Sequence, residues 1–343
     1  MSGLKTQIGW KAGPEQFPPQ ELLECAVVAE DVGFESIDVS DHFHPWSEEG
    51  QACFTWTWLG AAAVRTSSIR LGPGVTSPIL RYHPSVIAQA AATVAAFAPG
   101  RAYLAVGTGE ALNDYAATGQ WPGYTERKAR LEEALKLIRQ LWTGEEVTFE
   151  GQYYHTEGAR LYTRPEQPIP LYVSSMVPGS ASFAGRMGDG LWTVGGQEPE
   201  VYQQLLAQFE EGARAAGKDP AMMPRAIELN MEYFERPEDE DAAIQNHLKY
   251  WAGAYVPALY DQKVYTPAMS AQNGRVVGPD TLRKKGCISA DPEQHARFIQ
   301  RHIALGFTEI YVHSAAQDQR GFLRRFGRDV LPMVREGART TAV

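Results

Sequence analysis

The segment Ser40 to Trp46 reads Ser-Asp-His-Phe-His-Pro-Trp and places a carboxylate beside a titratable imidazole. Histidine suits general acid–base work because its ordinary pKa lies near neutral pH. His42 is therefore either a catalytic acid–base group or a loop histidine exposed to solvent. A metal site shared with His44 is not expected, because no third and fourth ligand stand nearby at a known spacing. Trp46 is either a core aromatic residue or a wall of the site.

A second candidate segment, Gly107-Thr108-Gly109-Glu110, joins two glycines to a carboxylate. Its glycines free backbone N–H groups for an anionic or polar ligand. A dinucleotide fingerprint needs a third glycine that is missing here, so that interpretation is weak. Glu110 is either a carboxylate presented to a ligand or a first-turn acid favoured by a helix dipole. A third segment, residues 72–78 (Gly-Pro-Gly-Val-Thr-Ser-Pro), suggests a distorted backbone such as a bulge.

All three segments lie at the end of a predicted β-strand. The eight predicted strands are residues 7–10, 36–39, 69–75, 102–106, 171–174, 191–194, 227–233 and 309–312. The predicted helices begin after Pro19 and otherwise cover residues 55–65, 84–97, 125–142, 181–187, 201–216, 239–251, 293–305 and 319–334. This alternation predicts parallel strands with helical crossovers, and eight units favour a closed (β/α)8 TIM barrel. The active site of such a barrel lies at the carboxyl ends of its strands, which favours a catalytic role for His42.

We expect one α/β domain over residues 1–343, with loop insertions near residues 146–165 and 254–285. The net charge is −9 and no dense Lys/Arg block occurs, so a nucleic-acid partner is not expected. The first ten residues have no apolar signal core, and no apolar run is long enough to span a bilayer. Three widely spaced cysteines indicate reduced thiols rather than a disulfide framework or zinc site. We therefore expect a cytoplasmic protein without a membrane segment.

Taken together, the segments resemble the luciferase-like superfamily, and within it the F420-dependent glucose-6-phosphate dehydrogenase family. The resemblance runs from about Lys5 to about Pro332. Its matching segments are Gly9-Trp10-Lys11-Ala12, Glu15-Gln16-Phe17, Ser40-Asp41-His42-Phe43, Pro45-Trp46, Arg81-Tyr82-His83-Pro84, Gly107 to Asn113 and Ala184 to Gly190. The resemblance implies a luciferase-like barrel, a homodimer and the deazaflavin coenzyme F420 as cofactor.

The same resemblance assigns roles to individual residues. It implies that His42 is the catalytic histidine and Glu110 the catalytic acid, with Trp46 and Glu15 beside them. The residues that it implies for binding the deazaflavin are Asp41, Ser77, Thr108, Gly109 and Asn113, with a cis peptide at Gly74-Val75 behind the ring. The residues that it implies near the phosphate tail are Met176, Val177, Gly179 and Ser180. The family has glycines at the first two tail positions, and this chain does not.

The substrate region departs from the glucose-6-phosphate pattern. That family holds the sugar phosphate with two lysines, an arginine and a threonine. By the resemblance, Val194 and Gln197 replace the threonine and one lysine, and Lys263 stands for the other lysine. Lys285 replaces the arginine and loses its two-point grip on phosphate. Residues 192–194 and 263–265 look more like the family's F420-dependent secondary-alcohol dehydrogenases.

We therefore expect F420-dependent hydride transfer from a C–OH carbon, in a secondary alcohol or sugar-type carbinol, to the deazaflavin. In this mechanism His42 takes the hydroxyl proton and Glu110 protonates the ring nitrogen side. Two alternatives stay open: an F420-dependent glucose-6-phosphate dehydrogenase and an FMN-dependent luciferase-like monooxygenase. A barrel that binds a cofactor without turnover is disfavoured by the pairing of His42 with Glu110.

Overall fold

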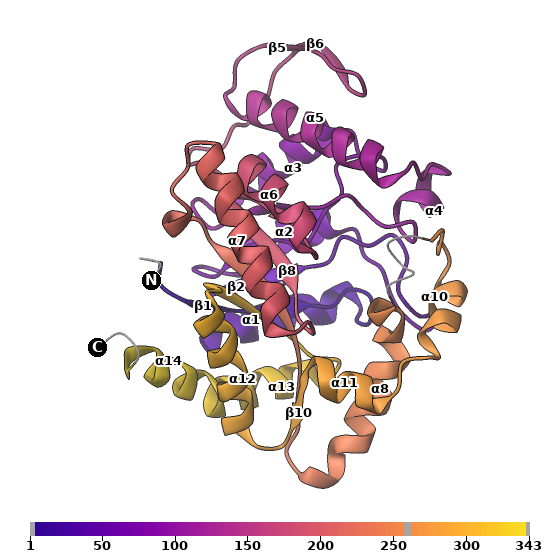
Figure 1. Cartoon of the computed structure of the whole chain (residues 1–343), viewed down its shortest axis with the longest axis vertical. Helices are drawn as coiled ribbons and strands as arrows, with labels where there is room; N and C mark the ends of the chain where they lie inside the picture. The colour runs from indigo at the N-terminus through magenta and orange to yellow at the C-terminus, as the bar shows by residue number, and fades with distance from the viewer. Residues whose placement is uncertain (1–3, 257–261, 341–343) are drawn as a thin grey trace.

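Eight parallel strands form a nearly closed barrel that helices surround (Figure 1). The structure is a computed structural model that describes residues 4–256 and 262–340. In spatial order the strands are β3 (Arg70–Pro73), β2 (Ser36–Val39), β1 (Gln7–Ala12), β11 (Glu309–His313), β9 (Arg225–Tyr233), β8 (Gly190–Val194), β7 (Leu171–Ser174) and β4 (Leu104–Val106). Backbone hydrogen bonds of 3.0 Å from Leu71 N to Arg101 O and from Thr76 N to Ala105 O connect β3 with β4. The predicted (β/α)8 barrel is confirmed.

Strand β1 shows how the sequence gives each strand two different faces. Ile8, Trp10 and Ala12 alternate along it and are buried in the main hydrophobic core. Lys11 points the other way and meets Asp38 of β2 inside the barrel. Because successive side chains of a strand point to opposite sides, the apolar residues face the helices and the residues between them fill the barrel.

Helices cover the outside of the barrel. Their bounds are α1 (Pro19–Asp31), α2 (Thr55–Arg65), α3 (Pro84–Phe97), α4 (Asp114–Thr118), α5 (Tyr124–Trp142), α6 (Pro178–Met187), α7 (Pro199–Ala215), α8 (Glu240–Trp251), α10 (Pro267–Gly274), α11 (Pro279–Lys285), α12 (Pro292–Leu305), α13 (Gln319–Asp329) and α14 (Leu331–Thr340). Many of them begin with proline, whose fixed φ suits the first helical turn and whose missing N–H costs nothing there. No helix in the described part of the chain is long and apolar enough to cross a membrane.

The structure adds elements that the sequence pattern did not reveal. Strand β10 (Cys287–Ser289) pairs with β9 beside the barrel. The insertion near residues 254–285 was expected to be irregular, but it contains α10 and α11. Thr266 accepts a hydrogen bond from Met269 N at the start of α10, which caps that helix. Residues 257–261 of this insertion lie outside the described residues. The predicted last helix is divided into α13 and α14, because Pro332 cannot continue the hydrogen bonding of α13.

The insertion near residues 146–165 forms a hairpin. Strands β5 (Val147–Glu150) and β6 (His155–Ala159) pair in antiparallel order. Figure 1 shows this hairpin standing away from the barrel, beyond α5. The turn between its two strands reaches back to the barrel, where Tyr154 is buried and donates to Ile79 O at 2.7 Å in the loop after β3.

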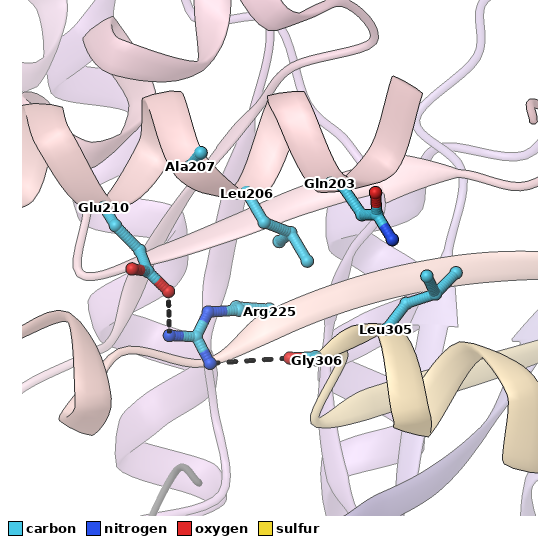
Figure 2. A pocket seen from close by; sticks show the side chains of 7 residues that line it. All are labelled: Gln203, Leu206, Ala207, Glu210, Arg225, Leu305 and Gly306. Carbon is cyan, nitrogen blue, oxygen red and sulfur yellow. Dashed lines mark hydrogen bonds and ion pairs between the residues drawn. The ribbon is translucent and has the colours of Figure 1, made fainter. Parts of the chain in front are cut away.

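A small cavity of about 250 Å³ lies at the amino end of the strands, on the side opposite to the candidate segments. Figure 2 shows its lining, which consists of Gln203, Leu206, Ala207, Glu210, Arg225, Leu305 and Gly306. Arg225 donates to Glu210 Oε1 at 3.1 Å, to Pro220 O at 2.9 Å and to Gly306 O at 3.4 Å. The protein itself compensates the charge of Arg225, so these contacts are typical of a structural role rather than of a ligand site.

We expect Arg225→Met to lower the free energy of unfolding by about 1–3 kcal/mol, because it removes the donor to partly buried acceptors. Urea denaturation measures this loss. The control is Arg214→Met, which removes an exposed partner of the same Glu210 and should change stability by less than about 0.5 kcal/mol. Equal losses of unfolding free energy in both variants would contradict the structural role of Arg225.

Candidate active site

Three ionisable side chains meet at the carboxyl ends of β1, β2 and β4. Glu15 follows β1, His42 follows β2 and Glu110 follows β4. The Nδ1 atom of His42 lies 3.5 Å from Glu15 Oε1, and its Nε2 atom lies 3.8 Å from Glu110 Oε2. The structure therefore brings together the histidine and both acids that the resemblance implies, with the imidazole between the two carboxyl groups.

Burial sets the protonation of this trio. The side chains of His42, Glu15 and Glu110 are 11%, 1% and 19% exposed. Burial, with the charges of Lys11 and Arg81, lowers the pKa of His42 to about 3. Burial raises the pKa of Glu15 to about 7, against the opposing charge of Lys11. Burial, assisted by the neighbouring Glu15, raises the pKa of Glu110 to about 8. At neutral pH the site holds a neutral imidazole, a Glu110 carboxyl group that is mostly protonated and a Glu15 carboxyl group close to its midpoint of titration.

An aromatic wall stands beside the imidazole. The rings of Trp46 and His42 meet edge to face with centroids 4.8 Å apart. Trp46 is buried with Leu112, Trp251 and Ala315, and Tyr255 packs against this cluster. Trp46 is thus both a core residue and a wall of the site, which joins the two interpretations left open by the sequence.

The backbone after β3 turns into the site through a cis peptide bond between Gly74 and Val75. Strand β3 ends at Pro73, two residues earlier than predicted, because of this turn. Gly74 is required by space, since a Cβ atom there would lie 1.7 Å from Asp38 Oδ1. Its carbonyl oxygen accepts a 2.5 Å hydrogen bond from Lys11 Nζ. The distortion expected from residues 72–78 is therefore present.

Asn113 ties the loop after β4 to the loop after β2. Its Oδ1 accepts hydrogen bonds from Phe43 N at 2.8 Å and His44 N at 3.3 Å, and its Nδ2 donates to Glu110 Oε2 at 3.4 Å. Gly109 has a φ of +73°, and this left-handed turn allows Glu110 to follow directly. These contacts fix the positions of the loops that carry His42 and Glu110 relative to each other.

Asp41 and Ser77 are both buried near the trio. The Asp41 carboxylate accepts hydrogen bonds from Arg81 at 2.8 Å, from Tyr82 at 3.0 Å and from Thr76. Its oxygens are therefore committed to the protein, and the acid organises the loops around the site. Ser77 lies 3.5 Å from Asp114 Oδ1, and Thr108 is half-buried in the neighbouring loop.

The start of α6 carries the four residues expected at the phosphate tail. Val177 precedes the helix and is 55% exposed, and Gly179 lies in its first turn with open space around it. Ser180 Oγ lies 2.6 Å from Ser175 Oγ. Met176 follows Ser175 in the chain, just before the helix. The free N–H groups of a helix start attract anions, so this end of α6 suits a phosphate.

The four residues expected at the substrate lie at the end of β8, in the loop after it, in the segment before α10 and at the end of α11. Val194 ends β8, and Gln197 Nε2 donates to Met176 O at 2.8 Å. Lys285 packs against Gly196, since a Cβ atom added to Gly196 would lie 3.0 Å from the Cβ of Lys285. The ammonium group of Lys285 lies 5.9 Å from the ring centre of Tyr255. The ammonium group of Lys263 lies 4.9 Å from the ring centre of Tyr115. Neither lysine forms an ion pair within the described residues.

Sequence reasoning missed two groups of polar residues. Inside the barrel, Lys11 lies 3.3 Å from Asp38 and 3.1 Å from Glu228, and Trp192 Nε1 donates to Asp38 at 2.8 Å. The signal was present, because a charged residue in the middle of a strand that is buried on both faces is unusual and needs a partner.

The second missed group is a hydrogen-bond network around Glu232. Glu232 accepts hydrogen bonds from His247 Nδ1 at 2.6 Å and from Ser314 Oγ at 2.7 Å, and His247 Nε2 lies 2.8 Å from the Tyr255 hydroxyl. These residues come from distant parts of the chain, so no local pattern indicated the network. Within the residues that the structure describes, no group of three or more His, Cys, Asp or Glu side chains could hold a metal ion.

Comparisons with known proteins agree with this geometry. The family described as luciferase-like monooxygenase matches residues 3–309. An F420-dependent glucose-6-phosphate dehydrogenase of Kineococcus radiotolerans is 41% identical over 335 residues, which cover 97% of this chain and 98% of that protein. The structure of an F420-dependent secondary alcohol dehydrogenase in complex with an F420-acetone adduct is 38% identical, with a TM-score of 0.91, and the match covers 96% of this chain and 99% of that one. An F420-dependent tetrahydromethanopterin reductase from Methanopyrus kandleri, 22% identical with a TM-score of 0.78 and with 96% and 99% of the two chains covered, shares the fold.

Proposed function

The chain belongs to the luciferase-like monooxygenase family, and we propose that within it the protein is an F420-dependent dehydrogenase that oxidises a C–OH carbon. The observation that carries this proposal is a neutral histidine held between two carboxyl groups whose pKa values are raised to near neutral pH. Oxidation of an alcohol releases a hydride and a proton, and this trio can manage the proton.

The residues of the site fit a deazaflavin on three grounds. Both carboxyl oxygens of Glu15 and Nδ1 of His42 are buried without a hydrogen-bond partner among the described residues, which leaves polar atoms for a ligand to satisfy. The Gly74-Val75 backbone offers a flat support for the cofactor ring. Residue 74 must be glycine there, because a Cβ atom would overlap the Asp38 carboxylate. The start of α6 can hold a phosphate tail. When bound, F420 accepts the hydride.

The chain's own residues handle the proton and the orientation. The hydroxyl proton passes to His42 Nε2, because Nδ1 is the buried nitrogen that faces Glu15. The lowered pKa of His42 keeps the imidazole neutral before the reaction and favours onward release of the proton that it receives. Glu110 holds a proton below pH 8 and supplies it to balance the charge that the hydride brings. The proton on Nε2 can return to Glu110 across the 3.8 Å gap.

An FMN-dependent monooxygenase is the competing function, because the family is named for that activity. The relatives of about 40% identity and the structure of 38% identity are F420 enzymes, and the monooxygenase structures in the comparison share 22% identity or less. The protonated Glu110 also favours hydride and proton transfer.

We expect the protein to bind F420 far more tightly than FMN or NADP. His42→Ala should lower single-turnover reduction of F420 by about 10²–10⁴-fold while changing its affinity much less, because it removes a general base. Fluorescence titration with each cofactor, beside stopped-flow turnover, measures both effects. Tight FMN binding without F420 binding would refute the cofactor assignment, and equal losses of affinity and rate in His42→Ala would show that His42 holds the cofactor instead.

For the substrate we propose a carbinol without a phosphate group. Burying a phosphate dianion without paired donors is costly, and this site offers fewer of them than the glucose-6-phosphate pattern. Val194 carries no hydroxyl group, and the amide of Gln197 is uncharged and already donates to Met176 O. One observation favours glucose-6-phosphate as second candidate: Lys263 and Lys285 contact aromatic rings and have no ion-pair partner in the described part of the chain.

We expect kcat/KM to be higher for secondary alcohols and glucose than for glucose-6-phosphate. The double change Val194→Thr and Gln197→Lys should raise kcat/KM for glucose-6-phosphate by about 10- to 100-fold, since a charge-assisted contact contributes about 1.5–3 kcal/mol. The control is Gln208→Lys, which adds the same charge on the helix α7, at a half-buried residue that donates to Glu211. Efficient oxidation of glucose-6-phosphate by the unchanged protein, lost in Lys263→Ala or Lys285→Ala, would promote the second candidate.

We also propose that the protein is a homodimer that associates through α2 and α3, and that it is cytoplasmic. Three exposed apolar side chains lie on two adjacent helices, Val64 on α2 and Val86 and Phe97 on α3. Helix α3 contains no charged residue. Exposed apolar patches of this kind mark interfaces. The three cysteines are free thiols, as in a reducing compartment.

We expect Phe97→Glu to shift the protein from dimer toward monomer, because it places a charge in the apolar patch. Light scattering during size-exclusion chromatography measures the mass. Tyr162→Glu, at an 89% exposed position next to the hairpin, is the control and should leave the mass unchanged. A monomeric wild-type protein would contradict the proposal.

A further inference from the structure

Two charged layers cross the inside of the barrel. In the lower layer, Arg70 lies 2.8 Å from Glu309 Oε1. In the upper layer, the Lys11 ammonium group lies 3.3 Å from Asp38 Oδ1 and 3.1 Å from Glu228 Oε2. The lysine side chain is 2% exposed, so it is as well buried as a core residue. The mechanism derived above gives neither layer a function.

The upper layer is joined directly to the active site. Lys11 Nζ donates a 2.5 Å hydrogen bond to Gly74 O, in the peptide chain that enters the site after β3. Asp38 packs against Gly74 from the same side, and Trp192 holds the other oxygen of that carboxylate at 2.8 Å. The backbone at Gly74 is therefore fixed from inside the barrel by a charged and fully paired group.

We propose that Lys11 is a positioning residue of the dehydrogenase reaction, which fixes the Gly74 carbonyl and places a buried positive charge beneath Glu15 and Glu110. The inference rests on the proposed function, because Gly74-Val75 is the expected support of the cofactor ring. Lys11 acts through these groups and not on the reacting atoms.

The charge of Lys11 opposes the effect of burial on the catalytic acids. Burial raises the pKa of Glu15 to about 7 and that of Glu110 to about 8, and in both cases the Lys11 ammonium group lowers it. Burial alone would lower the pKa of Lys11, but Asp38 and Glu228 outweigh it and keep the lysine protonated. The charged and titratable groups that face Glu110 are Glu15, His42, Asp114 and Lys11. Among these, Lys11 is a cation at every working pH.

Stability alone is a weak account of this layer. A buried ion pair contributes little net stability, because desolvation offsets most of the attraction. The lower layer provides the internal comparison, since Glu309 is buried and Arg70 partly buried in the barrel, and none of the hydrogen bonds or ion pairs of this layer goes to Gly74. If both layers served only stability, variants of the two layers would have equal effects on the titration of Glu110 and on turnover.

The test compares two matched double variants. Lys11→Met with Glu228→Gln removes one positive and one negative charge from the upper layer. Asp38 then loses its ion-pair partner but keeps the hydrogen bond from Trp192. Arg70→Met with Glu309→Gln makes the same deletion in the lower layer. The single variant Lys11→Arg keeps the charge and serves as a rescue. Thermal unfolding establishes that each variant is folded before function is measured.

The first readout is the titration of Glu110 in the protein without cofactor or substrate. Carbon-13 NMR of labelled glutamate carboxyls follows it, with Glu110→Gln to identify the signal. Removing the positive charge makes loss of the proton harder, so the pKa of Glu110 should rise in the upper-layer variant and stay unchanged in the lower-layer variant. This readout decides the inference even if wild-type protein fails to reduce F420, an outcome that would refute the proposed function alone.

The second readout is the pH profile of turnover with F420. Activity that needs a protonated Glu110 falls as pH rises through its pKa, so the upper limb should move to higher pH in the upper-layer variant. We expect kcat to fall by about 10- to 100-fold with a smaller change in KM, because the support of the ring is loosened. Lys11→Arg should restore part of the rate. Unchanged titration and kcat, or equal losses in the lower-layer variant, would overturn the assignment of Lys11.

Discussion

Removal of ionisable side chains from water at one end of the barrel is the constraint on which the site depends. Desolvation disfavours charge, so it keeps His42 neutral while raising the pKa values of Glu15 and Glu110 to near neutral pH. A solvent-exposed trio with the same spacing would carry an imidazole near its ordinary pKa and two ionised carboxylates. The fold achieves this burial with Trp46 on one side and the loop held by Asn113 on another.

The same constraint explains why the barrel interior is built in charged layers. Inward-facing positions of the strands carry Lys11, Asp38 and Glu228, which could not be buried singly. Each charge is balanced within a few ångströms, and tryptophan and tyrosine side chains fill the remaining space and satisfy the carboxylates. The outer faces of the same strands are apolar and hold the helices in place.

Sequence reasoning predicted the parts of this molecule that depend on local pattern. The eight barrel strands follow from apolar runs bounded by turn residues, and the loop with His42 was found because its residues are adjacent in the chain. Strand β10 is three residues long and pairs only beside the barrel, so it has no periodic signal. Likewise, the network of Glu232, His247 and Tyr255 joins segments brought together by the fold. The roles of Glu15, Gly74 and the α6 residues needed the family resemblance, since their local sequence is unremarkable.

The hydrogen bond from Gln197 to Met176 O connects the end of β8 with the segment before α6. A ligand that orders the Met176 segment therefore also restricts Gln197, and a ligand held near Gln197 restricts the Met176 segment. Free energies of binding are reciprocal, so tail and substrate must then influence each other's affinity by the same factor. Under the proposed assignment of these two segments, the short amide of Gln197 makes tail and substrate a cooperative pair, in which occupation of one region reduces the entropy that the other must lose.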